Sequence, residues 1–190
     1  GFSSVMFDGS TLSYEENIRQ TREVVKMCHA VGVSVEAELG AVGGDEGGAL
    51  YGHADESLFT DPMLARDFVD RTGIDALAVA IGNAHGKYKG EPLLDFPRLD
   101  TIRQQAAIPL VLHGGSGISD DDFKRAIELG IHKINFYTGM SQAALSAVET
   151  RMANRQPLYD EFAELLLGIE EAITDTVSEQ MRIFGSAGRV

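Results

Sequence analysis

The sequence of 190 residues has one cysteine, no tryptophan and only five prolines. A single cysteine, Cys28, excludes a disulfide within the chain and is typical of proteins from a reducing compartment. No apolar run reaches the roughly 18 residues that a membrane-spanning helix needs, and no signal-peptide pattern is present. From these absences we expect a cytoplasmic protein that does not enter a membrane.

Positive charge is also scarce, because 16 Lys and Arg residues face 29 Asp and Glu residues. The resulting net charge of −13 argues against non-specific binding to nucleic acid, which needs a positive surface. It leaves room for a local pocket that binds a small anionic molecule. We therefore expect a small-molecule partner and no nucleic-acid partner.

Strand-like and helix-like segments alternate along the chain. Between the apolar runs lie segments with helical spacing, with Ser13 and Glu16 as an expected capping box and Thr60 or Asp61 and Ser119 as further caps. From about Gly139 the chain is expected to be wholly helical, with helices over 139–153 and 157–182. Continuous apolar runs predict five parallel strands covered on both faces, at 3–10, 33–40, 76–82, 109–115 and 132–138.

Two architectures are compatible with this alternation, an open doubly wound sheet and a (β/α)₈ barrel. The first strand is not followed by a G-x-G-x-x-G loop, which weakens the dinucleotide-binding version of the doubly wound sheet. A barrel builds its chemistry at the carboxyl ends of its strands and usually needs roughly 250 residues. We predict an α/β fold that is the last five βα units of a TIM barrel, in one domain over 1–190, with βα units over 1–138, helices over 139–190 and about three units preceding Gly1. Polar residues occur at each expected strand end, namely Asp8, Glu38, His85, His113 and Asn135.

His85 and His113 each follow an apolar run and precede a glycine. Neutral imidazole is the commonest metal ligand, and catalytic zinc takes three protein ligands and keeps one open position. A hydrogen-bonded structural role is the alternative for each histidine. The remaining histidines, His29, His53 and His132, are expected in a helix, a solvated loop and a strand start, so the sequence shows no third ligand.

Two loops offer further chemistry. In "HGGSG" the glycines allow close backbone approach, and the backbone N–H groups with the Ser116 hydroxyl suit an anion; a plain tight turn is the alternative. The glycine-rich stretch between Glu38 and Thr60 is long for a compact domain and is typical of a binding loop that carries Asp45 and Glu46. A disordered acidic surface loop is the alternative for this stretch.

Four motifs, "VEAELGAVGGDEG", "AVAIGNAHGKY", "PLVLHGGSGI" and "KINFYT", together resemble those of the class II, zinc-dependent ketose-bisphosphate aldolases. This family includes fructose- and tagatose-bisphosphate aldolases, and the resemblance runs from "FDGS" to "GSAGR". It implies a TIM barrel and an aldolase (a carbon–carbon lyase of carbohydrate metabolism and glycolysis) that cleaves or forms a ketose phosphate. Zinc would stabilise the enediolate of dihydroxyacetone phosphate, and no Schiff-base lysine is needed.

The resemblance also implies roles for single residues. His85 and His113 match two of three zinc ligands, Asp8 and Glu38 match carboxylates that hold a second metal, and Glu46 matches the mobile-loop base. A monovalent cation, Na⁺ or K⁺, is implied near the glycine loops. The segments that bind the substrate phosphate are implied at Gly86, Gly114, Gly115, Ser116, Asn135, Phe136, Tyr137 and Thr138.

Two departures from the family pattern change the expectation. The family carries an Asp-His pair, a catalytic acid and a zinc ligand, on an earlier strand, and this chain has no such pair. We therefore expect the 190 residues alone to have low or no activity. Phe136 and Tyr137 are bulkier than the residues of many members at these positions. The sequence therefore does not fix which sugar is the substrate.

Alternative interpretations are a non-catalytic barrel-like partner subunit, an inactive fragment, or another phosphate-binding barrel enzyme such as an isomerase or epimerase. We expect a homo-oligomer, a dimer or tetramer.

Overall fold

The computed structural model describes residues 1–43, 56–86, 88, 92–155 and 161–189. These residues form two compact units, Gly1–Asn135 and Phe136–Val190, and each unit is described by itself. The division lies close to residue 138, where the sequence predicts the change from βα units to helices. A single domain over 1–190 stays a prediction.

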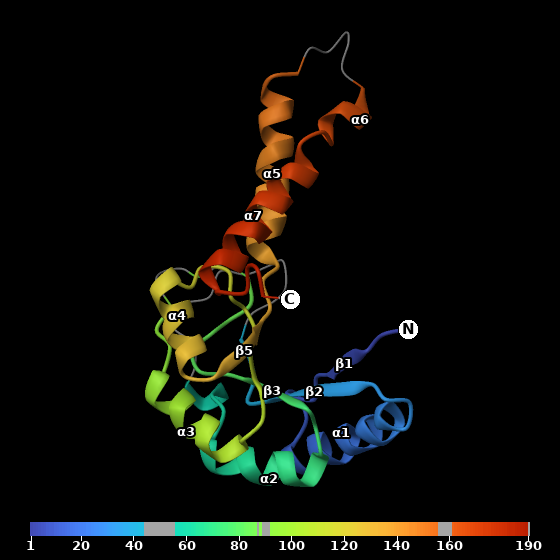
Figure 1. The fold of residues 1–190 in the computed structure, drawn as a ribbon, viewed down its shortest axis with the longest axis vertical. Helices are drawn as coiled ribbons and strands as arrows, with labels where there is room; N and C mark the ends of the chain where they lie inside the picture. The colour runs from blue at the N-terminus through green and yellow to red at the C-terminus, as the bar shows by residue number, and fades with distance from the viewer. Residues whose placement is uncertain (44–55, 87, 89–91, 156–160, 190) are drawn as a thin grey trace. The chain divides into compact units, whose positions relative to one another are not determined.

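The first unit is built on one parallel sheet of five strands (Figure 1). Neighbouring strands in the sheet are also neighbours in sequence, because each new strand pairs with the one before it. A doubly wound sheet reverses its strand order at a switch point, whereas a barrel adds strands in one direction. The sequential order therefore confirms the partial TIM barrel. The strands are β1 (Ser4–Phe7), β2 (Ser34–Leu39), β3 (Ala76–Val79), β4 (Leu110–Leu112) and β5 (Ile131–Ile134).

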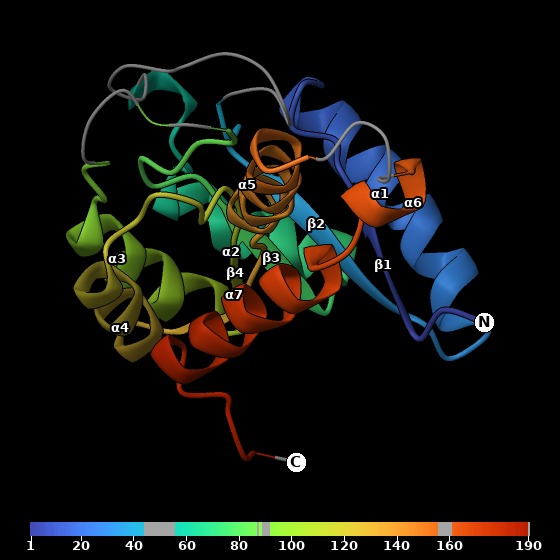
Figure 2. The ribbon, with the colours of Figure 1, turned by 90° about the horizontal axis from the view of Figure 1, so that it is seen from above.

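Helices connect the strands, and α1 to α3 follow one another along one face of the sheet (Figures 1 and 2). Asp61 and Ser119 cap α2 and α4 through side-chain hydrogen bonds, as predicted. The capping box expected at α1 is wrong: Ser13 makes no side-chain cap bond, and Glu16 binds Arg19 at 2.6 Å instead. The helices of this unit are α1 (Tyr14–His29), the 3₁₀ turn Glu56–Leu58, α2 (Pro62–Thr72), α3 (Phe96–Ala106) and α4 (Asp120–Glu128).

The two faces of the sheet differ in chemistry. In β2, Val35, Ala37 and Leu39 lie on one face and Glu36 and Glu38 on the other, because side chains alternate along a strand. The first face joins the apolar core of the helices, and the second is charged. Both faces of β2 are buried, as predicted, but the second face carries carboxylates where an apolar strand was expected. The core includes Ile18, Phe68, Leu77, Leu99, Ile102, Leu110, Leu112 and Phe123, all of them buried.

Thr60 joins the carboxyl ends of β2 and β3. Its side chain is fully buried, and the hydroxyl donates to the Leu39 carbonyl and accepts from the Ala80 amide at 2.9 Å. Thr60→Val is expected to lower the free energy of unfolding by about 2–4 kcal/mol, because two buried backbone groups lose their partner. Urea unfolding measures this loss. The control is Thr101→Val on the exposed side of α3, and an equally small change in both variants would contradict the expectation.

The second unit consists of helices α5 (Thr138–Ala153), α6 (Phe162–Leu165) and α7 (Ile169–Ile183). One continuous helix over 157–182 was the wrong expectation, because Gly168 adopts a φ of +87° and separates α6 from α7. Helices α5 and α7 pack against each other.

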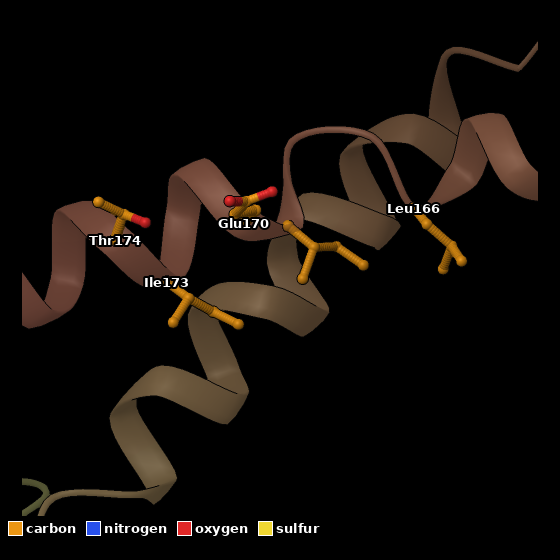
Figure 3. A pocket seen from close by; sticks show the side chains of 5 residues that line it. Leu166, Glu170, Ile173 and Thr174 are labelled. Atoms are coloured by element: carbon orange, nitrogen blue, oxygen red, sulfur yellow. The ribbon is translucent and has the colours of Figure 1, made fainter.

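Within the described ranges, no helix combines the length and apolar character needed to cross a membrane. Figure 3 shows a pocket on α7 and the turn before it, lined by Leu166, Ile169, Glu170, Ile173 and Thr174.

Candidate functional site

His113 lies at the centre of the charged face, directly after β4, and is 4% exposed. Its Nε2 atom is 2.8 Å from Glu36 Oε1, and its Nδ1 atom is 3.4 Å from Glu38 Oε2. Both glutamates come from β2, so these contacts reach across β3. The β3 residues in register with the two glutamates are Ala76 and Ala78, whose small side chains leave the space for this approach.

Charges of opposite sign compensate the burial of this cluster. Lys133 of β5 places its Nζ atom 2.8 Å from Glu36 Oε2. Burial alone raises the pKa of Glu36, but hydrogen bonds from His113 and Lys133 bring that pKa below its usual value. Burial lowers the pKa of His113, and its bonds to Glu36 and Glu38 outweigh this and raise the pKa to about 9. The cluster is thus a chain of paired charges that is buried at His113, Glu36 and Glu38 and exposed at Lys133.

The fold brings His85 beside His113. His85 is half-buried in the loop after β3, and the two imidazole rings are 5.9 Å apart between centroids at an interplanar angle of 48°. The backbone N–H of His85 donates to the Gly43 carbonyl at 2.7 Å, which fixes the loop against the chain after β2. The predicted pair of histidines on neighbouring strand ends is therefore present as a neighbouring pair of rings.

Two polar side chains connect the loops that carry these histidines, and the sequence analysis missed both. The Asn83 amide donates to the His113 carbonyl at 2.9 Å. The Tyr88 hydroxyl accepts from the Ala84 amide at 2.7 Å and donates to the Gly114 carbonyl at 3.0 Å. Burial raises the pKa of Tyr88 to about 12, so its hydroxyl keeps the proton that it donates. Neither residue type has a sequence pattern that predicts such a contact.

The glycine-rich loop after His113 approaches the end of β5. Gly114 adopts a φ of +66°, and a side chain at this position would meet the Ala84 carbonyl. The backbone N–H of Gly115 donates to the Asn135 carbonyl at 3.3 Å, and the Asn135 N–H donates to the Leu112 carbonyl at 2.9 Å. Half-buried Ser116 follows in the same loop. The structure thus brings together Gly114, Gly115 and Asn135, which the sequence analysis grouped.

The other predicted residues are distributed differently. Asp8 is exposed after β1, where it accepts from the Ser10 amide at 2.9 Å. Gly86 is buried beside His85 with a φ of +85°. Glu46 and His53 lie outside the described residues. The remaining predicted substrate residues belong to the second unit, with Tyr137 exposed just before α5; they are Phe136, Tyr137 and Thr138.

His29 and His132 were expected to be structural, and both make local hydrogen bonds. His29 Nε2 is 2.8 Å from Asp75 Oδ2, and His132 Nδ1 is 2.7 Å from the Gly130 carbonyl. Neither hydrogen-bond partner, Asp75 or the Gly130 carbonyl, is a residue of the charged cluster. These contacts support a structural role for the two side chains.

The donor atoms beside His113 fit Zn²⁺ in kind. Zinc binds imidazole nitrogen and carboxylate oxygen, and His85, His113 and Glu38 supply these atoms. With Nε2 of His113 bonded to Glu36, Nδ1 is the nitrogen left for a metal. Among the residues that the structure describes, no three His, Cys, Asp or Glu side chains lie close enough to hold one ion. The described residues therefore offer the right kinds of donor atom for zinc, but they do not form a complete set of ligands.

Sequence reasoning also missed Glu36 and Lys133. The period-two alternation in "VSVEAEL" was a signal for Glu36, because it places Glu36 on the same face as Glu38. Nothing in the sequence around Lys133 indicates its partner, which is 97 residues away. The pairing depends on the relative placement of β2 and β5.

Comparison with known proteins gives consistent results. Residues 1–189 match the family model described as "Fructose-bisphosphate aldolase class-II". The chain is 46% identical to the Escherichia coli K12 protein YdjI over 190 residues and 47% identical to a Geobacillus stearothermophilus fructose-bisphosphate aldolase over 189 residues. All of the chain is covered in both matches, and it spans 65% and 64% of the two relatives. The crystal structure of the YdjI aldolase matches all of the chain with a TM-score of 0.83 and 43% identity, over 63% of its own length.

Proposed function

The chain belongs to the class II fructose-bisphosphate aldolase family, and from this premise we propose that it forms part of a metal-dependent aldolase acting on a ketose phosphate. The observation that carries the proposal is the neighbouring pair of His85 and His113, with Glu38 beside His113. Metal ligands of different strands meet at the carboxyl end of a barrel, where barrel enzymes carry out their chemistry.

In this proposal His113 binds the metal through Nδ1, and His85 is a second ligand. Glu38 and Asp8 are carboxylates for a second metal position. When bound, Zn²⁺ supplies Lewis acidity toward the ketone and hydroxyl oxygens of dihydroxyacetone phosphate. A third protein ligand, beyond the residues placed here, completes the zinc site.

The glycine loops and the segment after β5 bind the phosphate of the substrate. Backbone N–H groups suit phosphate oxygens, and glycine permits the close approach. Glu46 takes the proton from the substrate carbon, and a monovalent cation, Na⁺ or K⁺, lies near the same loops. The whole protein is a homo-oligomer, a dimer or tetramer. The phosphate-binding residues are Gly86, Gly114, Gly115, Ser116, Asn135, Phe136, Tyr137 and Thr138.

Metal removal tests the proposal. In the whole protein, cleavage of a panel of ketose monophosphates and bisphosphates is measured before EDTA treatment, after it, and after Zn²⁺ is added back. We expect EDTA to lower turnover by about 100-fold or more, because Lewis-acid stabilisation is worth several kcal/mol, and Zn²⁺ to restore it. Mg²⁺ added in place of Zn²⁺ is the control.

Other outcomes favour the other candidates. Turnover that resists EDTA contradicts the proposal and favours an isomerase or epimerase. Capture of an aldolase partner without turnover or metal binding favours a non-catalytic subunit. The 190-residue chain, assayed beside the whole protein, is expected to show low or no turnover, and full turnover by the chain alone contradicts that expectation.

A further inference from the structure

We propose that Glu36 and Lys133 are positioning residues for the metal ligand His113. In this arrangement Lys133 holds the Glu36 carboxylate, and Glu36 holds the imidazole ring so that Nδ1 faces Glu38 and the metal. The inference rests on the proposed metal-dependent function and adds two residues to it. Neither residue belongs to the ligands or to the phosphate-binding segments described above.

The geometry of the three side chains supports this role. Glu36 uses both oxygens, with Oε1 at 2.8 Å from His113 Nε2 and Oε2 at 2.8 Å from Lys133 Nζ. The Glu36 side chain is 6% exposed, so few other partners can reach it. A carboxylate engaged at both oxygens has one orientation, and it therefore gives the ring one orientation.

The protonation chemistry of imidazole explains why orientation matters. A metal-binding imidazole must present a nitrogen lone pair to the ion, and its other nitrogen then carries the proton. An ionised carboxylate can only accept a hydrogen bond, so Glu36 requires the proton on Nε2. In the neutral ring that binds a metal, the lone pair then lies on Nδ1, the atom that is 3.4 Å from Glu38 Oε2.

Small side chains on β3 leave space for the contact between Glu36 and His113. Glu36 belongs to β2, His113 follows β4 and Lys133 belongs to β5, so the chain of contacts passes over β3. On that strand Glu36 is in register with Ala76, and Glu38 with Ala78. Larger side chains at these two positions would occupy the space that Glu36 crosses.

Metal affinity and ring protonation test the inference in the whole protein. Co²⁺ titration, followed by d–d absorption, gives the affinity and the coordination geometry. ¹⁵N NMR of the Zn²⁺-loaded, histidine-labelled protein gives the nitrogen that carries the proton, with the His113 signals assigned by their loss in His113→Gln. We expect the proton on Nε2 in the wild type.

Three substitutions remove the two contacts in steps. Lys133→Met is expected to weaken Co²⁺ binding by about tenfold, and Glu36→Leu by about 100-fold, within the range for residues that orient metal ligands. Glu36→Gln keeps an oxygen that accepts from Nε2 and is expected to recover part of the loss. Lys124→Met is the control, because this exposed lysine pairs with Asp121 on α4.

The outcomes separate this inference from the proposed function. If the wild type binds Zn²⁺ or Co²⁺ but folded Lys133→Met and Glu36→Leu keep its affinity, spectrum and ring protonation, the positioning role is wrong and the proposed function stands. A proton on Nδ1 of the wild type also overturns the role. If the wild type binds neither metal, both proposals fail. Lys133 is 53% exposed, so its variant tests the role even where Glu36→Leu does not fold.

Discussion

Replacing His113 by alanine is expected to abolish tight Zn²⁺ binding by the whole protein and to lower its turnover by more than about 100-fold. Changes to residues that only orient a metal ligand already cost about 10–100-fold in affinity, and this substitution removes the ligand itself. Zinc content after dialysis and turnover of a ketose phosphate measure the two effects. His85→Ala is expected to give the same pattern, because both rings are proposed ligands.

His113→Ala has a second consequence, which the experiment has to separate from metal loss. The imidazole lies between Glu36 and Glu38, so its removal leaves Glu36 paired with Lys133 and takes from the buried Glu38 its contact with His113. Unpaired buried charge is strongly destabilising. His113→Gln keeps more of the side-chain volume and polar atoms, and it tests metal binding in a protein whose fold is less disturbed.

A matched histidine serves as the control for both substitutions. His132 is exposed and its ring bonds to the nearby Gly130 carbonyl, so His132→Ala is expected to keep its zinc and its turnover. Stoichiometric zinc in folded His113→Ala or His113→Gln would contradict the assignment of His113 as a ligand. Equal zinc loss in His132→Ala would indicate a general effect on the fold.

Gly114→Ala is expected to lower the free energy of unfolding by about 2–5 kcal/mol and to weaken zinc binding. The φ of +66° costs an alanine about 1–2 kcal/mol. In addition, the new methyl group would meet the backbone of Ala84, next to His85, and relieving an overpacked contact costs about 1–3 kcal/mol. Relief of that contact separates the loops that carry His85 and His113.

Gly32→Ala isolates the backbone contribution. Gly32 has a similar φ of +73°, and a side chain there would meet no atom within 4 Å. We expect a loss of about 1 kcal/mol and unchanged zinc affinity for this variant. Urea unfolding and zinc titration of both variants give the comparison. If both lose the same stability and keep the same affinity, close packing of the histidine loops is not what requires glycine at position 114.

Features encoded over short stretches could be predicted from the sequence. The alternation of strands and helices, the caps at Asp61 and Ser119, and the position of His113 directly after its strand all depend on neighbouring residues. The proximity of Gly115 to Asn135 follows from the same logic, because adjacent parallel strands end at one edge. The capping box is a local error, since Glu16 pairs instead with Arg19, three residues further along the same helix.

The contacts of His113 with its partners could not be predicted from neighbouring residues. Glu36 is 77 residues from His113, and Lys133 is 97 residues from Glu36. Their meeting depends on strand register, on the irregular pairing between β4 and β5, and on small residues in β3. A one-residue change of register would turn Glu36 to the opposite face of the sheet. Residue order thus specifies the strands and their ends, whereas the charged cluster exists only because packing sets how those strands align.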